Sequence, residues 1–351
     1  MLSFFKRLFR VWGNEVAVDL GTAYTLIYVK GQGIVLNEPS VVAVDQATGK
    51  VLAVGYEAKR MLGKTHKGIL AKRPMKDGVI TDFEMVQEML YTFLSKTISK
   101  HLWANPRTLI AVPSAVTEVE LRAVRDSAES AGSREVLLVA EPVAAAVGIG
   151  IDIDEPAGHM IVDVGGGTTE IAVISLSGIV TDTSIRVAGD EMDEAIIQFI
   201  RDHYRVEVGQ QTAEQIKIEI GNVFPLEETR RMEVRGRDLV SGAPKTIEVN
   251  SDEIREALKP VVYQIIDAVK RALERTPPEL VADIIDRGIY LSGGGSQLRG
   301  FAALLREETN LAVNVVENPV ECVALGAGKI LEEIDRYRKV LIQPRSQVTT
   351  R

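Results

Sequence analysis

Residues 161–170 read Ile-Val-Asp-Val-Gly-Gly-Gly-Thr-Thr-Glu, and residues 16–22 read Val-Ala-Val-Asp-Leu-Gly-Thr. Each stretch is an apolar run that ends in Asp and is followed by small residues and Thr. This pattern predicts a strand, a carboxylate and a tight turn with exposed backbone N–H groups, which can bind phosphate oxygens. Two such turns facing one cleft would hold a nucleotide between two similar halves of the protein.

The spacing of these stretches predicts two domains. The chain has 351 residues, too many for one ordinary core, and Asp163 lies about one domain length after Asp19. After the second stretch, the order of predicted strands and helices partly repeats that of the first half. We therefore expect a duplicated α/β protein with helical and strand insertions.

The composition excludes several classes of protein. A net charge of −8 argues against a general nucleic-acid binder, because clustered Lys and Arg hold phosphate backbones. No segment approaches the roughly 18 unbroken apolar residues of a membrane span. Four His and the single Cys322 leave few metal-site or disulfide options. Cys322 is expected to be a small buried residue in a reducing cytoplasm.

The first twelve residues contain no acidic side chain, although the whole chain is acidic. On a helix, the large apolar residues of this segment cover one half of the circumference and its cations lie on the other. This arrangement is typical of a helix that lies in a membrane interface. The alternative is a helix packed on the body of the protein. The candidate membrane residues are Leu2, Phe4, Phe5, Leu8, Phe9 and Trp12.

Hydrophobic periodicity and turn residues predict the other elements. Strands are expected over 16–19, 25–29, 34–36, 41–44, 108–112, 136–139, 171–174, 179–183 and 289–291, and helices over 81–100, 118–131, 191–204 and 251–274, with an Ala-rich helix from Pro142. Thr81 or Asp82 can cap the first of these helices. Residues 230–249 are polar and alternating, which predicts a hairpin.

The two loops offer carboxylates and N–H groups to a nucleotide and its metal. Asp19 and Asp163 can hold the water shell of a Mg²⁺ that bridges phosphates, since Mg²⁺ keeps most of its waters. The N–H groups of residues 21–24 and 165–168 would meet phosphate oxygens directly. An ordinary Asp-Gly turn is the alternative for either loop alone. It explains poorly both loops together with a run of glycines, 293–295, after a third strand.

One acid stands where a strand ends and a helix begins in the first half. Glu141, in Val139-Ala140-Glu141-Pro142, could orient the water that attacks a γ-phosphate, a positioning role more than a strong-base one. The alternative is an acid that complements the dipole at the helix start. Thr168 could share the water, or simply satisfy a turn.

Two further motifs are less specific. Glu214 and Lys217 share one face of a predicted polar helix, where they could form a surface salt pair or, beside a nucleotide, hold a ribose and base. Gly63-Lys64-Thr65 looks like the end of a Walker A loop, but Ala58 stands where that motif needs its first Gly. We therefore do not interpret it as a phosphate loop.

Taken together, the motifs resemble the actin and heat-shock-chaperone ATPase superfamily. The set, in chain order, is Asp-Leu-Gly-Thr (19–22), Glu-Pro-Val-Ala-Ala-Ala (141–146), Asp-Val-Gly-Gly-Gly-Thr (163–168), Gly-Asp-Glu-Met-Asp (189–193), Ala-Glu-Gln-Ile-Lys (213–217) and Ser-Gly-Gly-Gly (292–295). Residues 37–43, residues 218–221 and the length narrow the resemblance to the MreB family, the bacterial actins of rod-shape determination. It covers the chain from about Glu15 to Arg336.

The resemblance implies an actin-like, ribonuclease-H-like ATPase fold with ATP and Mg²⁺ in the central cleft. It implies catalytic roles for Glu141 and Thr168, and contact with Mg²⁺ through water for Asp19 and Asp163. The implied nucleotide-binding residues are Gly21, Thr22, Ala23, Tyr24, Gly165, Gly166, Gly167, Thr168, Glu214, Gln215, Ile216, Lys217, Gly293, Gly294, Gly295 and Ser296.

The resemblance also implies an organisation in segments. These are an amphipathic membrane-binding helix (1–13), domain I (14–150) with a small insertion at about 37–80, domain II (151–336) with an insertion at about 189–250, and a C-terminal tail (337–351). Members of the family form antiparallel double filaments on the inner membrane face and contact cell-wall elongation proteins. A small hydrophobic loop adds to their membrane contact, and Leu102 and Trp103 match it; the alternative for this pair is the core.

Three positions depart from the family pattern. Tyr24 stands where Asn is usual in the first phosphate loop, Ala140 where an acid commonly precedes Glu141, and Ala188 where Gly is usual. Tyr24 matters most, because a bulky ring at the phosphates could alter nucleotide affinity or the coupling of hydrolysis to assembly. A divergent paralogue is therefore an open alternative.

The sequence favours a slow, filament-forming ATPase that lies on the inner face of the cell membrane and maintains rod shape. A chaperone-type ATPase would need a substrate-binding domain after the core, and we expect too few residues there for one. A sugar or acetate kinase of the superfamily, or an ATPase without filaments, is the remaining alternative. A kinase would need an acceptor pocket, and residues 37–80 offer no obvious one.

Overall fold

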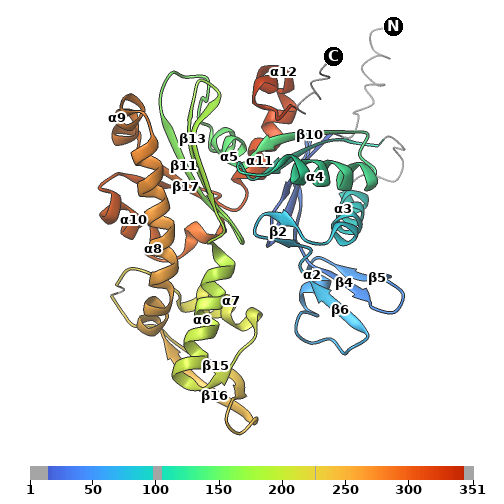
Figure 1. The fold of residues 1–351 in the computed structure, drawn as a ribbon, viewed down its shortest axis with the longest axis vertical. Coiled ribbons are helices and arrows are strands. Elements are labelled where there is room, and N and C mark those ends of the chain that lie inside the picture. The colour runs from blue at the N-terminus through green and yellow to red at the C-terminus, as the bar shows by residue number, and fades with distance from the viewer. Residues whose placement is uncertain (1–14, 98–104, 226, 344–351) are drawn as a thin grey trace, which may run out of the picture.

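The computed structural model describes residues 15–97, 105–225 and 227–343. The predicted N-terminal helix, the Leu102-Trp103 loop and the last part of the predicted tail lie outside these ranges. Figure 1 shows two halves side by side, each with a sheet in its upper part and a smaller unit below it.

The first half is built on a five-stranded sheet of order β10-β9-β1-β2-β3. Its strands are β1 (Glu15–Leu20), β2 (Tyr24–Val29), β3 (Gly33–Pro39), β9 (Arg107–Val112) and β10 (Glu135–Ala140). Strands β1, β2 and β3 form an antiparallel meander, and β9 and β10 run parallel to β1. The strands expected over 16–19, 25–29, 34–36, 108–112 and 136–139 are therefore confirmed.

The second half repeats this sheet with the order β13-β12-β11-β17-β18. Its strands are β11 (His159–Val164), β12 (Thr169–Ser175), β13 (Gly178–Ile185), β17 (Ile289–Ser292) and β18 (Val313–Val315). Strand β11 is antiparallel to β12 and parallel to β17, as β1 is to β2 and β9. The predicted duplication is confirmed, and Asp19 and Asp163 each lie one residue before the end of equivalent strands.

Two helices join the halves between the sheets. These are α5 (Glu141–Ile149) and α11 (Cys322–Glu332), and their buried side chains form one core with residues of both sheets. A Cβ on Gly148 would lie 1.9 Å from the carbonyl O of Cys322, and one on Gly326 would lie 1.7 Å from that of Ala144. The backbones of α5 and α11 approach this closely because neither glycine has a side chain.

Each half carries a smaller unit at the lower end of the molecule (Figure 1). In the first half, β4 (Val42–Asp45), β5 (Val51–Val54) and β6 (Ile69–Lys72) form a sheet beside the short helix α2 (Tyr56–Lys59). In the second half, β14 (Val206–Glu207), β15 (Arg231–Asp238) and β16 (Pro244–Asn250) form a sheet beside α6 (Gly189–Tyr204) and α7 (Gln210–Ile220). The predicted hairpin at 230–249 is the β15–β16 pair.

The remaining elements surround the sheets. They are β7 (Met75–Lys76), β8 (Val79–Ile80), α3 (Phe83–Thr97), α4 (Glu118–Ser130), α8 (Ser251–Arg275), α9 (Pro278–Arg287), η1 (Gly294–Gln297), α10 (Phe301–Thr309), α12 (Ile334–Tyr337) and η2 (Arg338–Val340). Of the two predicted caps, Asp82 accepts a hydrogen bond from the N–H of Met85 at the start of α3. Among the helices of the described ranges, none combines the length and apolar character that crossing a bilayer requires.

Candidate functional site

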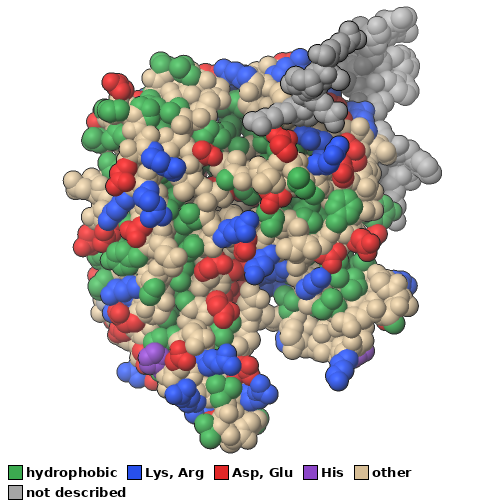
Figure 2. Space-filling model, viewed as in Figure 1, with side chains coloured by type: hydrophobic (Ala, Val, Ile, Leu, Met, Phe, Trp, Pro, Cys, Tyr) green, Lys and Arg blue, Asp and Glu red, His purple; other side chains and the backbone are tan. Residues whose placement is uncertain are grey.

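A cleft of about 690 Å³ lies between the two halves. In Figure 2 the surface is hollowed between the two small units, and acidic and basic side chains lie along this notch. Most of the residues predicted from the sequence line the cleft, and they come from elements of both halves. They are Asp19, Gly21, Thr22, Ala23, Tyr24, Glu141, Asp163, Gly165, Gly166, Gly167, Thr168, Glu214, Lys217, Gly293, Gly294 and Gly295.

The two predicted loops have the same backbone turn. The N–H of Gly21 donates to the carbonyl of Tyr24 at 3.1 Å, and that of Gly165 donates to the carbonyl of Thr168 at 2.9 Å. The loops also meet each other, because a Cβ on Gly166 would lie 2.6 Å from the Cβ of Ala23. Glycine at position 166 therefore allows the loops of the two halves to approach closely in one cleft.

Asp19 and Asp163 lie at the base of the cleft. Burial, and then the charge of Asp163, raises the pKa of Asp19 to about 7. Burial also raises the pKa of Asp163 to about 6, although the Ser292 hydroxyl donates to its carboxylate at 2.7 Å. Buried carboxylates of like charge are stabilised by a cation, and oxygen ligands suit Mg²⁺. The donor set therefore fits the metal that the sequence predicted.

Glu141 begins α5 and lines the same cleft. Its side chain is buried, and burial raises its pKa well above the usual range. The charges of Glu170, Asp19 and Asp163 act in the same direction. Glu141 therefore faces the acidic base of the cleft, and its place at the helix start does not remove it from the site.

A second buried acid, Glu170, was not found from the sequence. It stands in β12, where its carboxylate accepts hydrogen bonds from the backbone N–H and the hydroxyl of Ser114 at 3.0 and 2.8 Å. Ser114 follows β9, so Glu170 ties the first half to the second. The second loop motif ends in this glutamate, but nothing in the sequence pairs it with Ser114.

Helix α7 presents only part of its predicted set to the cleft. Glu214 and Lys217 line it, but they do not form the predicted salt pair with each other. Glu214 pairs with Lys59 at 2.8 Å, and Lys217 pairs with Asp193 at 2.8 Å. Because both partners lie outside α7, the interpretation as a surface pair within one helix was wrong.

Three predicted residues do not line the cleft. Gln215 is exposed and donates to Glu219, and Ile216 is fully buried in the core of the second half. Each is turned away from Glu214 by the roughly 100° per residue of an α-helix. Ser296 is buried, and its hydroxyl donates to the carbonyl of Gly293. Its side chain therefore supports the glycine turn.

Several cleft residues were missed. Tyr56, Arg73, Asp190 and Arg299 line it, and the Arg73 guanidinium lies 2.5 Å from the Asp190 carboxylate in the other half. Asp190 belongs to the motif Gly-Asp-Glu-Met-Asp (189–193), which carries part of the family resemblance. The others come from loops and short helices that tertiary packing brings to the cleft, and no local pattern marks them.

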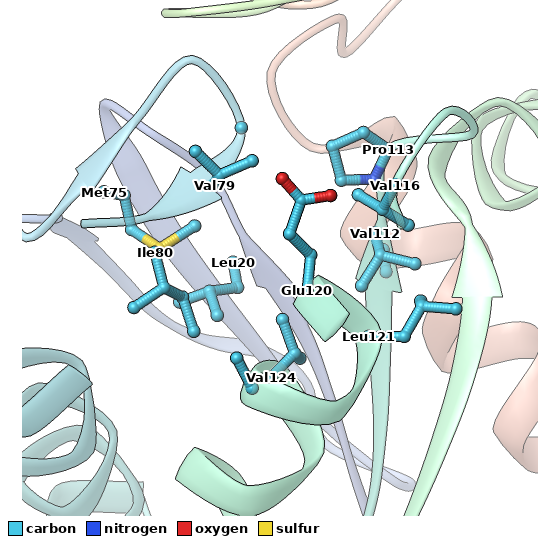
Figure 3. A pocket seen from close by; sticks show the side chains of 13 residues that line it. Leu20, Met75, Val79, Ile80, Val112, Pro113, Val116, Glu120, Leu121 and Val124 are labelled. Carbon is cyan, nitrogen blue, oxygen red and sulfur yellow. The ribbon is translucent and has the colours of Figure 1, made fainter. Parts of the chain in front are cut away.

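A second, much smaller pocket of about 40 Å³ lies behind the first loop. Figure 3 shows apolar side chains from β7, β8, β9 and α4 around it, with the Glu120 carboxylate between Val79 and Pro113. Glu120 accepts from the N–H and hydroxyl of Thr117 and thereby caps α4. This volume has room for only a few waters, so the large cleft is the candidate site.

Comparison with known proteins agrees with this architecture. The model of the MreB/Mbl protein family matches residues 13–339. The cell shape-determining protein Mbl of Bacillus cereus is 52% identical over 329 residues, which are 94% of this chain and 99% of the relative. The cell shape-determining protein MreB of Escherichia coli is 52% identical over 342 residues, 96% of this chain and 98% of the relative.

A solved structure shows the same fold. It is MreB5 of Spiroplasma citri bound to AMPPNP, with a TM-score of 0.89 and 39% identity, and the match covers 93% of this chain and 98% of that one. The fold of the chain and its relatives lead to the same conclusion: the sheets are repeated, the cleft is central, and the relatives share both the family and the fold. The chain has the actin-like fold and belongs to the MreB/Mbl family of cell shape-determining proteins.

Proposed function

We propose that the chain binds ATP with Mg²⁺ in the cleft, hydrolyses it slowly and assembles into filaments that organise cell-wall synthesis. The observation that carries this proposal is the pair of matching loops, one from each half, that meet above Asp19 and Asp163. The Spiroplasma relative has been solved with ADP and with AMPPNP, which supports the choice of nucleotide.

In this proposal, each of the domains proposed from the sequence, 14–150 and 151–336, contributes one loop to the phosphates. The N–H groups of residues 21–24 and 165–168 donate to phosphate oxygens. Glu214 and Lys217 approach the ribose from α7, and the turn at Gly293–Gly295 borders the adenine. Gln215, Ile216 and Ser296 lie outside the cleft lining, and Ser296 supports the glycine turn through the carbonyl of Gly293.

Asp19 and Asp163 would hold Mg²⁺ through water, and the ion would supply charge neutralisation between the phosphates and the two carboxylates. Glu141 accepts a hydrogen bond from the attacking water and orients it toward the γ-phosphate, and Thr168 shares that water. Glu141, the first residue of α5, is buried at the base of the cleft. Its position keeps bulk water from competing for that orientation.

We further propose that hydrolysis acts as a timer for assembly and that filaments lie on the inner face of the cell membrane. Support comes from the family and from the N-terminal sequence, in which a basic face lies opposite Phe, Leu and Trp. A single helix of this kind anchors weakly, whereas many copies on one filament anchor by avidity. Residues 1–13, Leu102 and Trp103 are the proposed membrane contacts, and elongation proteins in the membrane are the proposed partners.

Sedimentation of the purified full chain tests this proposal. With Mg²⁺ and ATP at micromolar protein, we expect polymer in the pellet and slow phosphate release. With liposomes that contain anionic lipid, the polymer should float with the vesicles. Deletion of residues 2–12 should abolish flotation and leave sedimentation largely intact. Persistent absence of polymer, with and without liposomes, would contradict the filament function.

A further inference from the structure

A contact between α2 and α7 crosses the cleft at its open side. The Lys59 ammonium, at the end of α2, lies 2.9 and 2.8 Å from the two carboxylate oxygens of Glu214. Both side chains are about one-fifth exposed, so the pair is largely sheltered from solvent. Glu214 is the residue that the proposed function places beside the ribose.

Lys59 has a second partner in the first phosphate loop. Its ammonium lies 3.1 Å from the hydroxyl oxygen of Tyr24 and 5.1 Å from the centre of the Tyr24 ring. The ring meets Tyr56 edge to face, with centroids 6.5 Å apart. Tyr24 is therefore held in place by its neighbours, and its hydroxyl fixes where the Lys59 ammonium lies.

Helix α7 also holds the backbone of Lys59. The side-chain amide of Gln211, one turn before Glu214, donates to the carbonyl of Lys59 at 2.5 Å and to that of Leu62 at 3.3 Å. The C-terminal end of α2 is thereby capped from the other half of the protein. Lys59 is thus positioned through its main chain as well as its ammonium group.

The charge of Lys59 is retained in this position. Burial acts to lower its pKa, but the hydrogen bonds to Glu214 and Tyr24 outweigh burial and raise the pKa. Lys217, which lies on the same face of α7 as Glu214, bonds instead to Asp193 and to the carbonyl of Gly189. The ion pair of Glu214 is therefore with Lys59, from the opposite half.

We propose that Lys59, held by the Tyr24 hydroxyl, positions the Glu214 carboxylate to accept hydrogen bonds from the ribose hydroxyls. This inference rests on the proposed nucleotide site. A carboxylate oxygen has two lone pairs, so Glu214 can accept from Lys59 and from a sugar hydroxyl together. The first loop then reads the sugar through Tyr24 and Lys59 in addition to binding the phosphates. Lys59 and Tyr24 are positioning residues in this arrangement.

Binding of ATP, 2′-deoxy-ATP and 3′-deoxy-ATP to the full chain with Mg²⁺ tests the proposal. A hydrogen bond to a charged group is worth on the order of tenfold in affinity, so wild type should bind at least one deoxy analogue about tenfold more weakly than ATP. Lys59→Met should reduce this ratio toward one. Tyr24→Phe removes only a hydroxyl and should reduce the ratio about threefold. Lys59→Arg keeps the charge and should restore part of it.

The controls separate this proposal from the proposed function. Lys64→Met changes an exposed lysine just after α2 and should leave the ratio at the wild-type value. Wild type that does not bind ATP would contradict the proposed function itself. Wild type that prefers ATP, with an unchanged or larger ratio in both Lys59→Met and Tyr24→Phe, would overturn the positioning role alone. Thermal melting of each variant confirms that it is folded.

Discussion

Each half carries an aspartate near the end of an equivalent strand, but within the described part of the chain only Asp163 of these two accepts a hydrogen bond from a hydroxyl group. In the parallel strand pairs, Asp163 of β11 is in register with Ser292 of β17, and Asp19 of β1 is in register with Ala111 of β9. Ser292 donates to Asp163, which accords with the lower pKa of Asp163, about 6 against about 7 for Asp19. The duplicated fold therefore repeats the carboxylate and varies its environment.

The helices that follow the last strand of each sheet differ in a similar way. In the first half α5 begins with Glu141 at the cleft, and in the second half α11 begins with the buried thiol of Cys322. Symmetric loops can hold a symmetric set of phosphate oxygens, but a water must attack from one side. In the proposed function, phosphate binding is therefore shared between the halves, whereas the acid that orients the attacking water, Glu141, comes from the first half.

The largest effect should come from exchanging the acid that only one half possesses. Glu141→Ala removes the carboxylate that accepts a hydrogen bond from the water, so phosphate release should fall roughly a thousandfold. ATP binding and assembly should persist. The matched change at the equivalent helix start, Cys322→Ala, should leave phosphate release per folded molecule within about twofold of wild type. Equal losses in both variants would contradict the assignment of chemistry to the first half.

The second largest effect should be the dependence of the free energy of unfolding on pH. The folded pKa of Asp19 is about 7 and its usual value is 3.8, so between these values the folded chain binds more protons than the unfolded chain. Without nucleotide, the free energy of unfolding should therefore fall as pH rises from about 4 to about 8, by on the order of 3 kcal/mol from Asp19. Urea unfolding at several pH values measures this.

Two variants show which half carries the pH dependence. Asp19→Asn stays neutral and should remove the whole contribution of Asp19, whereas Asp163→Asn should remove the smaller contribution of Asp163 and, with its charge, part of the rise in the pKa of Asp19. Saturating Mg²⁺ and ATP should also reduce the slope, since a bound cation favours the ionised carboxylates. Identical profiles for the two Asn variants would show that the environments of the aspartates do not differ as described.

The next largest effect should come from the contact between α5 and α11, which joins the two halves. Gly326→Ala places a methyl group against the carbonyl of Ala144, where the ideal Cβ lies at 1.7 Å, so α5 and α11 must separate. We expect a loss of about 2 kcal/mol in the free energy of unfolding. Gly178→Ala is the control, because its Cβ would meet its nearest neighbour at an ordinary 3.6 Å. A similar loss in both variants would mean that the helix crossing is not tightly packed.

The smallest effect concerns Ser292, whose hydroxyl distinguishes the surroundings of Asp163 from those of Asp19. Ser292→Ala makes the surroundings of Asp163 resemble those of Asp19, and its lost hydrogen bond should cost about 1 kcal/mol of unfolding free energy at pH 8. The reciprocal change, Ala111→Ser, places a hydroxyl beside Asp19 and should lower its pKa. Titration of the two carboxyl groups by carbon-13 NMR should show opposite shifts. Shifts in the same direction would contradict the role given to Ser292.

The sequence predicted those parts of the site that are local along the chain. The two loops, Glu141 and the glycine turn at 293–295 each combine a strand end with small residues, and the structure brings them to one cleft. Contacts between distant segments could not be predicted in this way. The ion pair of Lys59 with Glu214 and the bond of Ser114 to Glu170 depend on how the halves pack.

The nucleotide contacts predicted for α7 agree with the cleft lining at some positions and not at others, for a specific reason. The motif predicts nucleotide contacts at four consecutive positions, 214–217, but only two of these positions line the cleft. Gln215 and Ile216 fall on other faces of the helix: Gln215 is exposed, and Ile216 packs in the core of the second half. A consecutive motif on a helix predicts a place in the structure better than it predicts the direction of each side chain.

Calorimetric titration of ATP with Mg²⁺ into the full chain measures directly whether both halves share one nucleotide. We predict one site per chain in wild type, at least about tenfold weaker binding in Asp19→Asn and in Asp163→Asn, and dependence of both losses on Mg²⁺. Binding that persists unchanged in either variant would contradict a nucleotide held jointly by the two halves.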